Sequence, residues 1–253
     1  IYLKIMHSIK LKYSYLSMFS NLIKKIYYEK YSKKSHSISN VDLIIDRIFR
    51  DKAKGVYIDV GCNHPIKYNN TYLLHKRGWS GINIDLDQTC INEFNNMRRK
   101  DHNIQELVGS IDGEEKEIYY YHERSAINTI SKTLADKRQT KPREILVKKT
   151  KSLNKIIEAS PYNNKKINFM SIDIENYEYE ALKNFNFQKY QIDLIVTECT
   201  DTNQGKLETY TQSLDYIIST NIYKLLEKNE YKLINWVNSD LVFVKKNFEG
   251  TEL

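Results

Sequence analysis

The sequence predicts an α/β fold built around a mostly parallel sheet, and three features lead to that prediction. Short apolar runs with the length of buried strands alternate along the chain with segments of helical periodicity. Strands and helices in alternation form a parallel sheet that is covered on both faces. At the C-terminus, two strand-like runs flank Asn238-Ser239-Asp240 and predict a hairpin that adds an antiparallel strand.

The N-terminal 39 residues differ in character from the rest of the chain. Apolar side chains recur at intervals of three and four through residues 1–31, with lysines between them, which predicts a basic amphipathic helix. Residues 32–39 are polar and serine-rich, as expected of a linker. We expect the helix to pack on the following domain, since such stripes commonly face a core; peripheral contact with a membrane is the alternative. Residues 40–253 then form the α/β domain.

The elements of this domain follow from apolar length and periodicity. A short amphipathic helix over residues 41–49 leads into a buried strand over residues 55–60. Residues 70–76 read as a helix that ends near Gly78, and a strand over residues 80–84 follows. The same criteria predict helices at 88–99, 152–159, 178–185 and 213–228, and strands at 104–108, 117–121, 144–149, 167–174, 193–197, 232–237 and 241–245.

Composition and charge exclude several classes of protein. The net charge is +7, but the basic residues are not interleaved with aromatic ones, so we expect no nucleic-acid partner. Cys62, Cys90 and Cys199 have no metal-ligand spacing, which argues against a zinc site or disulfide framework and favours a cytoplasmic location. No apolar run reaches the roughly 18 residues of a transmembrane helix. The sequence gives no indication of oligomeric state.

The first strand and the second strand carry the features of a nucleoside-binding half-site. The first runs into the turn Gly61-Cys62-Asn63, and the second ends on Asp85. Gly61 has no Cβ, so the backbone amides of the turn can approach a ligand closely. The Asp85 carboxylate can accept hydrogen bonds from both hydroxyls of a ribose.

Polar side chains stand at the ends of the predicted parallel strands. They are Asp59, Asp85, Ser110, Asp173 and Glu198. Ligands of open parallel sheets bind at this edge, and carboxylates are seldom buried unless they are paired or liganded. The set therefore predicts a pocket. Glu175 follows Asp173 closely and is placed to reach an acceptor, whereas Glu178 belongs either to the site or to the cap of the next helix.

Several segments together resemble the FkbM-type methyltransferases over roughly residues 40 to 246. They are residues 57–65, 70–72, 78–82, 151–153, 169–178 and 195–198. The chain departs from the family at Asn176, where glycine is usual, and at Asp85-Leu86-Asp87, where glutamate and proline are common. Both changes are conservative, because asparagine tolerates a left-handed turn and the carboxylate is kept. The order of elements is similar to the seven-stranded, Rossmann-like fold of class I S-adenosylmethionine-dependent methyltransferases.

The resemblance implies methyl transfer from S-adenosylmethionine to a hydroxyl oxygen of a sugar, glycan or other small molecule such as a secondary metabolite. The residues that it implies for cofactor binding are Asp59, Gly61, Cys62, Asn63, Thr71, Asp85, Leu86, Ser110 and Asp173. The candidates for the catalytic base or acceptor anchor are Asp173, Glu175, Glu198 and His64. Loops over residues 125–143 and 200–210 are expected to line the acceptor pocket. Mg²⁺ held by Asp173 and Glu198 is an alternative that we do not favour.

Three other functions fit the sequence less well. An NAD(P)-dependent oxidoreductase would also use Asp85, but Asn63 and Ile66 occupy the second and third glycine positions of its phosphate-binding turn. A non-catalytic binding protein that retains the fold would not need the acidic strand ends. A nucleic-acid methyltransferase would normally show an Asn-Pro-Pro-Tyr-like or paired-cysteine motif, and neither is present.

Overall fold

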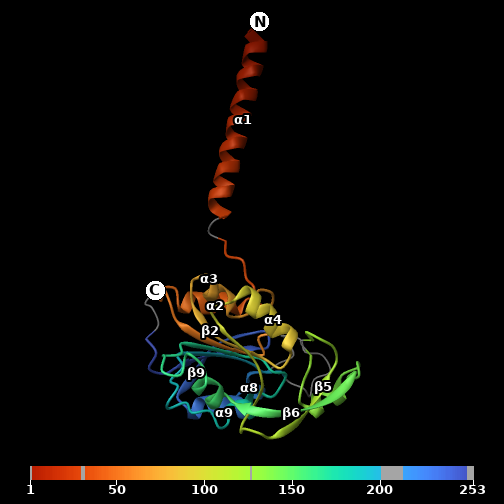
Figure 1. The fold of residues 1–253 in the computed structure, drawn as a ribbon. Coiled ribbons are helices and arrows are strands. Elements are labelled where there is room, and N and C mark those ends of the chain that lie inside the picture. Colours follow the sequence, from red (N-terminus) through yellow and green to blue (C-terminus); the bar gives the residue numbers. More distant parts are fainter. Residues whose placement is uncertain (1, 30–31, 126, 201–212, 250–253) are drawn as a thin grey trace. The chain divides into compact units, whose positions relative to one another are not determined.

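The computed structural model describes residues 2–29, 32–125, 127–200 and 213–249, which divide into two compact units, residues 1–34 and 35–253. The first unit consists mainly of α1 (Tyr2–Glu29), the helix predicted for residues 1–31 (Figure 1). None of the described helices is both long enough and apolar enough to cross a membrane. Residues 35 and 36 belong to the second unit, where Ser35 Oγ and the backbone N–H of His36 both donate to the Asp42 carboxylate at 2.6 Å.

Seven strands form the main sheet of the second unit, in the order β3-β2-β1-β7-β8-β10-β9 (Figure 1). Their bounds are β1 (Val56–Val60), β2 (Ser80–Asp85), β3 (His102–Gln105), β7 (Phe169–Ile172), β8 (Leu194–Glu198), β9 (Tyr231–Val237) and β10 (Asp240–Lys245). The strands from β3 to β8 pair in parallel, and β10 runs antiparallel to both β8 and β9. The predicted mostly parallel seven-stranded sheet with a C-terminal antiparallel hairpin is confirmed.

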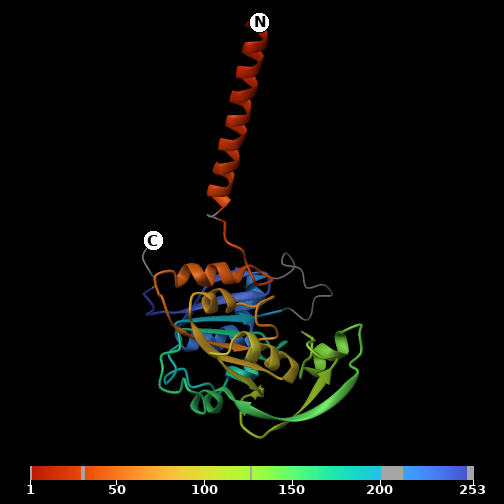
Figure 2. The ribbon, with the colours of Figure 1, turned by 45° about the horizontal axis from the view of Figure 1, so that its top comes forward.

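A second sheet of three strands projects beside the main one (Figure 2). It contains β4 (Leu107–Gly109), β5 (Glu115–Tyr120) and β6 (Glu144–Ser152), and β6 pairs parallel with β4 and antiparallel with β5. The single strand predicted over residues 104–108 is therefore two strands in different sheets. The chain changes sheet at Glu106, because Leu107 finds its pairing partner in Thr150 of β6.

Helices cover both faces of the main sheet. Successive side chains of a strand point to opposite faces, so neighbouring residues pack against different helices. Side chains such as Ile58 and Val60 pack with α6 (Leu153–Glu158), α7 (Glu178–Leu182), α8 (Leu214–Ser219) and α9 (Asn221–Lys228). Alternate side chains such as Tyr57 pack with α2 (Val41–Ile48) and α3 (Tyr72–Lys76) on the opposite face (Figure 1). The helix α4 (Gln88–Met97) packs beside β2 and β3.

Two helical predictions differ from the structure in detail. The helix predicted over residues 213–228 is interrupted at Thr220, whose side chain accepts the N–H of Tyr223 and so caps the start of α9. The loop predicted over residues 125–143 contains a short helix, α5 (Lys132–Lys137), which is capped in the same way by Ser131. In both places a short polar side chain accepts a hydrogen bond from a backbone N–H group and so starts a new helix. Hydrophobic periodicity alone does not reveal where such a helix starts.

Candidate active site

A cavity of about 240 Å³ opens at the carboxyl ends of the parallel strands. Seven predicted site residues line it: Gly61, Asn63, Asp85, Leu86, Asp173, Glu175 and Glu198. Five others are not part of its lining: Asp59, Cys62, His64, Thr71 and Ser110. The site therefore combines groups from β1, β2, β7 and β8 with others that support it from behind.

The Gly61 turn is held in one conformation from two sides. The N–H groups of Gly61 and Cys62 both donate to the carbonyl of Ile84 in β2, at 2.9 and 3.1 Å. Gly61 has a φ of +76°, and a Cβ on it would lie 1.9 Å from the carbonyl oxygen of Asp173. Only glycine meets both conditions, since an L-residue is strained at this φ and has no room for its side chain.

Asp85 is both fixed in position and able to bind a ligand. One carboxylate oxygen accepts the N–H of Asn63 and the other accepts the N–H of Asp87, each at 2.9 Å. Each oxygen keeps a second acceptor position. Burial raises the pKa of Asp85 to about 6, although the two backbone N–H groups oppose the shift. The adjoining wall includes the apolar side chains of Leu86 and Val108, so this side of the cavity suits a ribose with an attached planar base.

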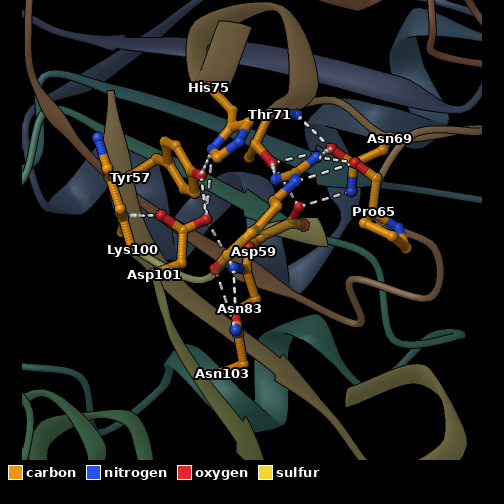
Figure 3. Close-up of polar contacts among 12 residues, drawn as sticks. Tyr57, Asp59, Pro65, Asn69, Thr71, His75, Asn83, Lys100, Asp101 and Asn103 are labelled. Carbon is orange, nitrogen blue, oxygen red and sulfur yellow. Dashed lines mark hydrogen bonds and ion pairs between the residues drawn. The ribbon is translucent and has the colours of Figure 1, made fainter. Parts of the chain in front are cut away.

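A buried polar network supports the turn from behind (Figure 3). Asp59 accepts hydrogen bonds from Asn69 Nδ2 at 2.9 Å and from Thr71 Oγ1 at 2.8 Å. Arg98, which is 1% exposed, donates to Thr71 Oγ1 and Asn69 Oδ1, each at 2.7 Å, and to the carbonyl of Pro65 at 2.9 Å. Burial raises the pKa of Asp59, and nearby Arg98 limits the rise. Asp59 and Thr71, predicted as cofactor contacts, thus hold the shape of the turn instead of lining the cavity.

A second buried cluster continues this network across the sheet (Figure 3). The Tyr57 hydroxyl donates to the carboxylate of Asp101, which lies just before β3. The same carboxylate accepts Asn83 Nδ2 at 3.0 Å and the N–H of Gly81 at 3.2 Å. These bonds tie β1 and β2 to the chain that enters β3. They belong to the scaffold, since none of the groups lines the cavity.

Three other predicted site residues, Cys62, His64 and Ser110, also lie outside the cavity lining, and each contributes to packing, to a turn or to the second sheet. Cys62 is buried and packs against α4. His64 Nδ1 accepts the N–H groups of Ile66 and Lys67, each at 3.0 Å, so it closes a turn and this nitrogen is not available as a base. Burial also lowers the pKa of His64. Ser110 follows β4 in the small sheet, because the strand that was predicted to carry it splits at Glu106.

Three carboxyl groups meet where β7, β8 and β10 end or begin. Asp173 follows β7, Glu198 is the last residue of β8, and Asp240 lies opposite Glu198 in the antiparallel ladder. Carboxyl oxygens of Asp173 and Glu198 lie within 4.8 Å of each other, and the pKa of each group depends on the other. The surroundings of Asp173 withhold water from its charge and raise its pKa to about 6, although the residue is exposed towards the cavity; the charge of Glu175 adds to the rise and the interaction with Glu198 opposes it. Burial raises the pKa of Glu198 well above its ordinary value, and the charge of Asp173 adds to that rise. Asp240, also with a pKa raised to about 6 by burial, was not predicted because it reads as a turn residue.

Glu175 ties a loop to the edge of the cavity. Its carboxylate pairs with Arg138, and its carbonyl accepts Thr129 Oγ1 at 3.2 Å. Burial raises the pKa of Glu175, and the Arg138 guanidinium opposes the rise. Ser125 and Thr129 line the cavity, so part of the segment predicted to line the acceptor pocket lies at this site. Of the second predicted loop, residues 201–210 lie outside the described residues.

Glu178 belongs to the scaffold of this edge. It is buried, it does not line the cavity, and its Oε1 accepts the N–H of Ile174 at 2.8 Å. Burial raises its pKa to about 8. Of the two interpretations left open by the sequence, the structure favours the structural one, since Glu178 fixes the turn that carries Asp173 and Glu175.

A divalent cation is compatible with one group of side chains. Carboxylate oxygens of Asp173, Glu175 and Glu198 lie within 4.8 Å of one another. Oxygen ligands of this kind suit Mg²⁺. Clusters of acidic side chains also occur without a metal, and Glu175 is already paired with Arg138. The use of Mg²⁺ stays an unfavoured alternative, to be tested with a chelator.

The seven-stranded sheet, with its cavity at the carboxyl ends of the parallel strands, places the second unit among the Rossmann-like α/β folds. Residues 59–233 match the model of the methyltransferase FkbM domain. The match covers more than half of the chain, and the chain belongs to this family.

Among solved structures, the chain is similar to a TehB-like SAM-dependent methyltransferase from Corynebacterium glutamicum, with 12% identity over 91% of this chain and 99% of that one and a TM-score of 0.41. It is also similar to monomeric WbdD, with 10% identity over 87% of this chain and 43% of that one and a TM-score of 0.40. A comparison with curated protein sequences gives no match.

Proposed function

We propose that this chain methylates a hydroxyl oxygen of a sugar, a glycan or a secondary metabolite, and that the Asp173–Glu198 pair removes the proton of that hydroxyl. The observation that carries the proposal is this close pair of carboxyl groups, whose oxygens lie within 4.8 Å of each other, whose pKa values are raised and which lines the same cavity as Asp85. Family membership supports S-adenosylmethionine as the methyl donor, whereas oxygen as the acceptor atom is our inference from the side chains.

The residues of the cavity fit the cofactor at three points. The Gly61–Asn63 turn offers a close backbone approach, and Asp85 and Leu86 offer acceptor oxygens and an apolar wall. Asp173 lies across the turn from Asp85 and presents negative charge, which suits the positively charged end of the cofactor. When bound, S-adenosylmethionine supplies an activated methyl group for in-line displacement. The chain's own task is then to orient the acceptor and to take its proton.

The acid pair is suited to proton removal because its pKa lies close to neutral pH. A general base works best when its pKa approaches the pH of the reaction, and Asp173 has a pKa of about 6. Asp173 is therefore suited to accept the proton of a hydroxyl, with Glu198 close beside it. Glu175 is less suited to this role, since its charge is already balanced by Arg138.

The charge of the cavity supports a neutral acceptor. Six acidic residues line it, namely Asp85, Asp87, Glu106, Asp173, Glu175 and Glu198, and no lysine or arginine does so in the described ranges of the chain. Carboxylates accept hydrogen bonds from hydroxyl groups and repel phosphate groups. We therefore infer that a neutral polyhydroxyl compound is preferred over a phosphorylated one.

The test is transfer of a labelled methyl group to a panel of neutral glycosides and the matching sugar phosphates. With an acceptor in hand, we expect Glu198→Gln to lower turnover about a hundredfold or more, the range of a general base, and to change the cofactor Kd far less. Glu178→Gln is the matched control, because Glu178 is also buried with a raised pKa but lies outside the cavity. Normal turnover of both Asp173→Asn and Glu198→Gln would place proton removal elsewhere, and tighter binding of NADH than of S-adenosylmethionine would overturn the assignment.

A further inference from the structure

The net charge of the chain is confined to its N-terminal unit. Residues 1–34 contain eight lysines and one glutamate, whereas residues 35–253 contain 31 basic and 31 acidic residues. The net charge of +7 for the whole chain therefore resides in the first unit, and the methyltransferase unit is neutral. The net charge of the whole chain does not show that the two units differ in this way.

The second half of α1 has one apolar face. Leu16, Phe19, Leu22, Ile23 and Ile26 follow one another at intervals of three, three, one and three, and each side chain is more than half exposed. At 100° per residue, they fall within one half of the helix circumference. The other half carries Ser17, Asn21, Lys24 and Lys25. Apolar side chains on one face and lysines on the other are arranged as in helices that lie in a membrane interface.

We propose that α1 binds the surface of an anionic lipid bilayer, with its apolar face inserted among the lipids and its lysines at the headgroups. Two independent observations support an anionic bilayer as the binding partner of α1: the exposed apolar face of the helix and the concentration of positive charge in the same unit. Nucleic acid would be attracted by the lysines but offers no place for Leu16, Phe19 and Ile23. A second copy of α1 would cover the apolar face but would add five further lysines to the five that α1 already carries.

The consequence for the enzyme is spatial. Ser35 and His36 are bonded to Asp42 of α2, and Ile38 lines the cavity. The chain thus passes from α1 to the wall of the candidate active site within about ten residues. An enzyme bound through α1 would work on acceptors present at the bilayer surface. This inference concerns where the enzyme acts and stands apart from the proposed chemistry.

The experiment is co-sedimentation of the full chain with vesicles of phosphatidylcholine containing 30–40% phosphatidylglycerol (about one anionic lipid in three, enough to attract basic helices) and with vesicles of phosphatidylcholine alone. We expect binding to the anionic vesicles only. Lys24→Gln with Lys25→Gln should lower the partition coefficient about 25-fold, since each lysine near an anionic surface contributes about fivefold. Phe19→Ser with Ile23→Ser should lower it at least as much.

Matched controls separate this proposal from its rivals. Ser17→Ala with Asn21→Ala changes the polar face without altering charge and should leave binding unchanged. Each variant should keep the wild-type Kd for S-adenosylmethionine, which shows that the methyltransferase unit is folded whether or not the proposed acceptor is right. No binding of the wild-type chain to anionic vesicles overturns the proposal. Binding to nucleic acid that survives Phe19→Ser with Ile23→Ser, or self-association that those changes abolish, would also overturn it.

Discussion

Replacing Gly61 by alanine would place a methyl group against the end of a neighbouring strand. The new Cβ would lie 1.9 Å from the carbonyl oxygen of Asp173 and 3.0 Å from its carbonyl carbon. Neither side can easily move away. The turn is bonded to Ile84 of β2, and the N–H of Asp173 donates to the Val60 carbonyl at 3.0 Å. The substitution therefore forces apart the two segments that carry the turn and the candidate acid pair.

The loss of unfolding free energy in Gly61→Ala has two contributions, backbone strain and overpacking. A substitution at a second glycine, Gly113, measures the first contribution by itself. An L-residue held at a φ near +76° costs about 1–2 kcal/mol. Overpacking against backbone adds about 1–3 kcal/mol, so the free energy of unfolding should fall by about 2–5 kcal/mol in Gly61→Ala. Gly113 has a φ of +78°, but a Cβ added to it would meet no atom within 4 Å. Gly113→Ala should therefore show the first part alone, about 1–2 kcal/mol.

The assay is urea unfolding of both variants together with calorimetric titration of S-adenosylmethionine. We expect Gly61→Ala to weaken cofactor binding at least tenfold, about 1.4 kcal/mol, because the turn and Asp173 both shift. Gly113 lies in a turn of the small sheet, so its replacement should leave the Kd unchanged. Equal losses of stability in the two variants with no change in either Kd would refute the close packing of Gly61 against Asp173.

Four further outcomes are expected. Asp85→Asn should weaken S-adenosylmethionine binding by about 2 kcal/mol, and wild-type affinity should fall below about pH 6 as Asp85 takes up a proton; calorimetry at pH 5 and pH 8 checks both. Arg98→Met should lower the free energy of unfolding by about 3–5 kcal/mol by leaving the Asp59 charge buried without its partner, and adding Asp59→Asn should restore part of that loss in a denaturant series. Because the pKa of Glu178 rises to about 8 on folding, its contribution to stability is lost as pH rises from about 4 to 8; Glu178→Gln should therefore unfold at higher urea than wild type at pH 8 and match it near pH 4. Activity should persist in EDTA, whereas loss that Mg²⁺ reverses would favour Asp173 and Glu198 as metal ligands.

Local patterns in the sequence were enough to predict the sheet and one side of the site. Apolar runs, helical periods and the terminal hairpin depend on residues that are close along the chain. The Gly61 turn and Asp85 were predicted because each follows directly from its own strand. The change of sheet at Glu106 was missed, since the choice between two sheets depends on β6, about 40 residues further on.

The side of the sheet that each polar group faces was decided only by the tertiary structure. Asp59 and Tyr57 are two residues apart, so they share a face, and that face meets α3 and Arg98 instead of the cavity. Nothing near Arg98 in the sequence indicates that it closes a network with residues about 30 positions earlier.

Proximity within the acid cluster also depends on the assembled sheet. Asp173 and Glu198 meet because β7 and β8 are neighbours, and Asp240 joins them through the register of β10. The sequence by itself predicted seven of the residues that line the cavity and the elements that carry them. Only the packing of those elements decided which carboxyl groups lie close enough to shift one another's pKa, because these groups are distant along the chain.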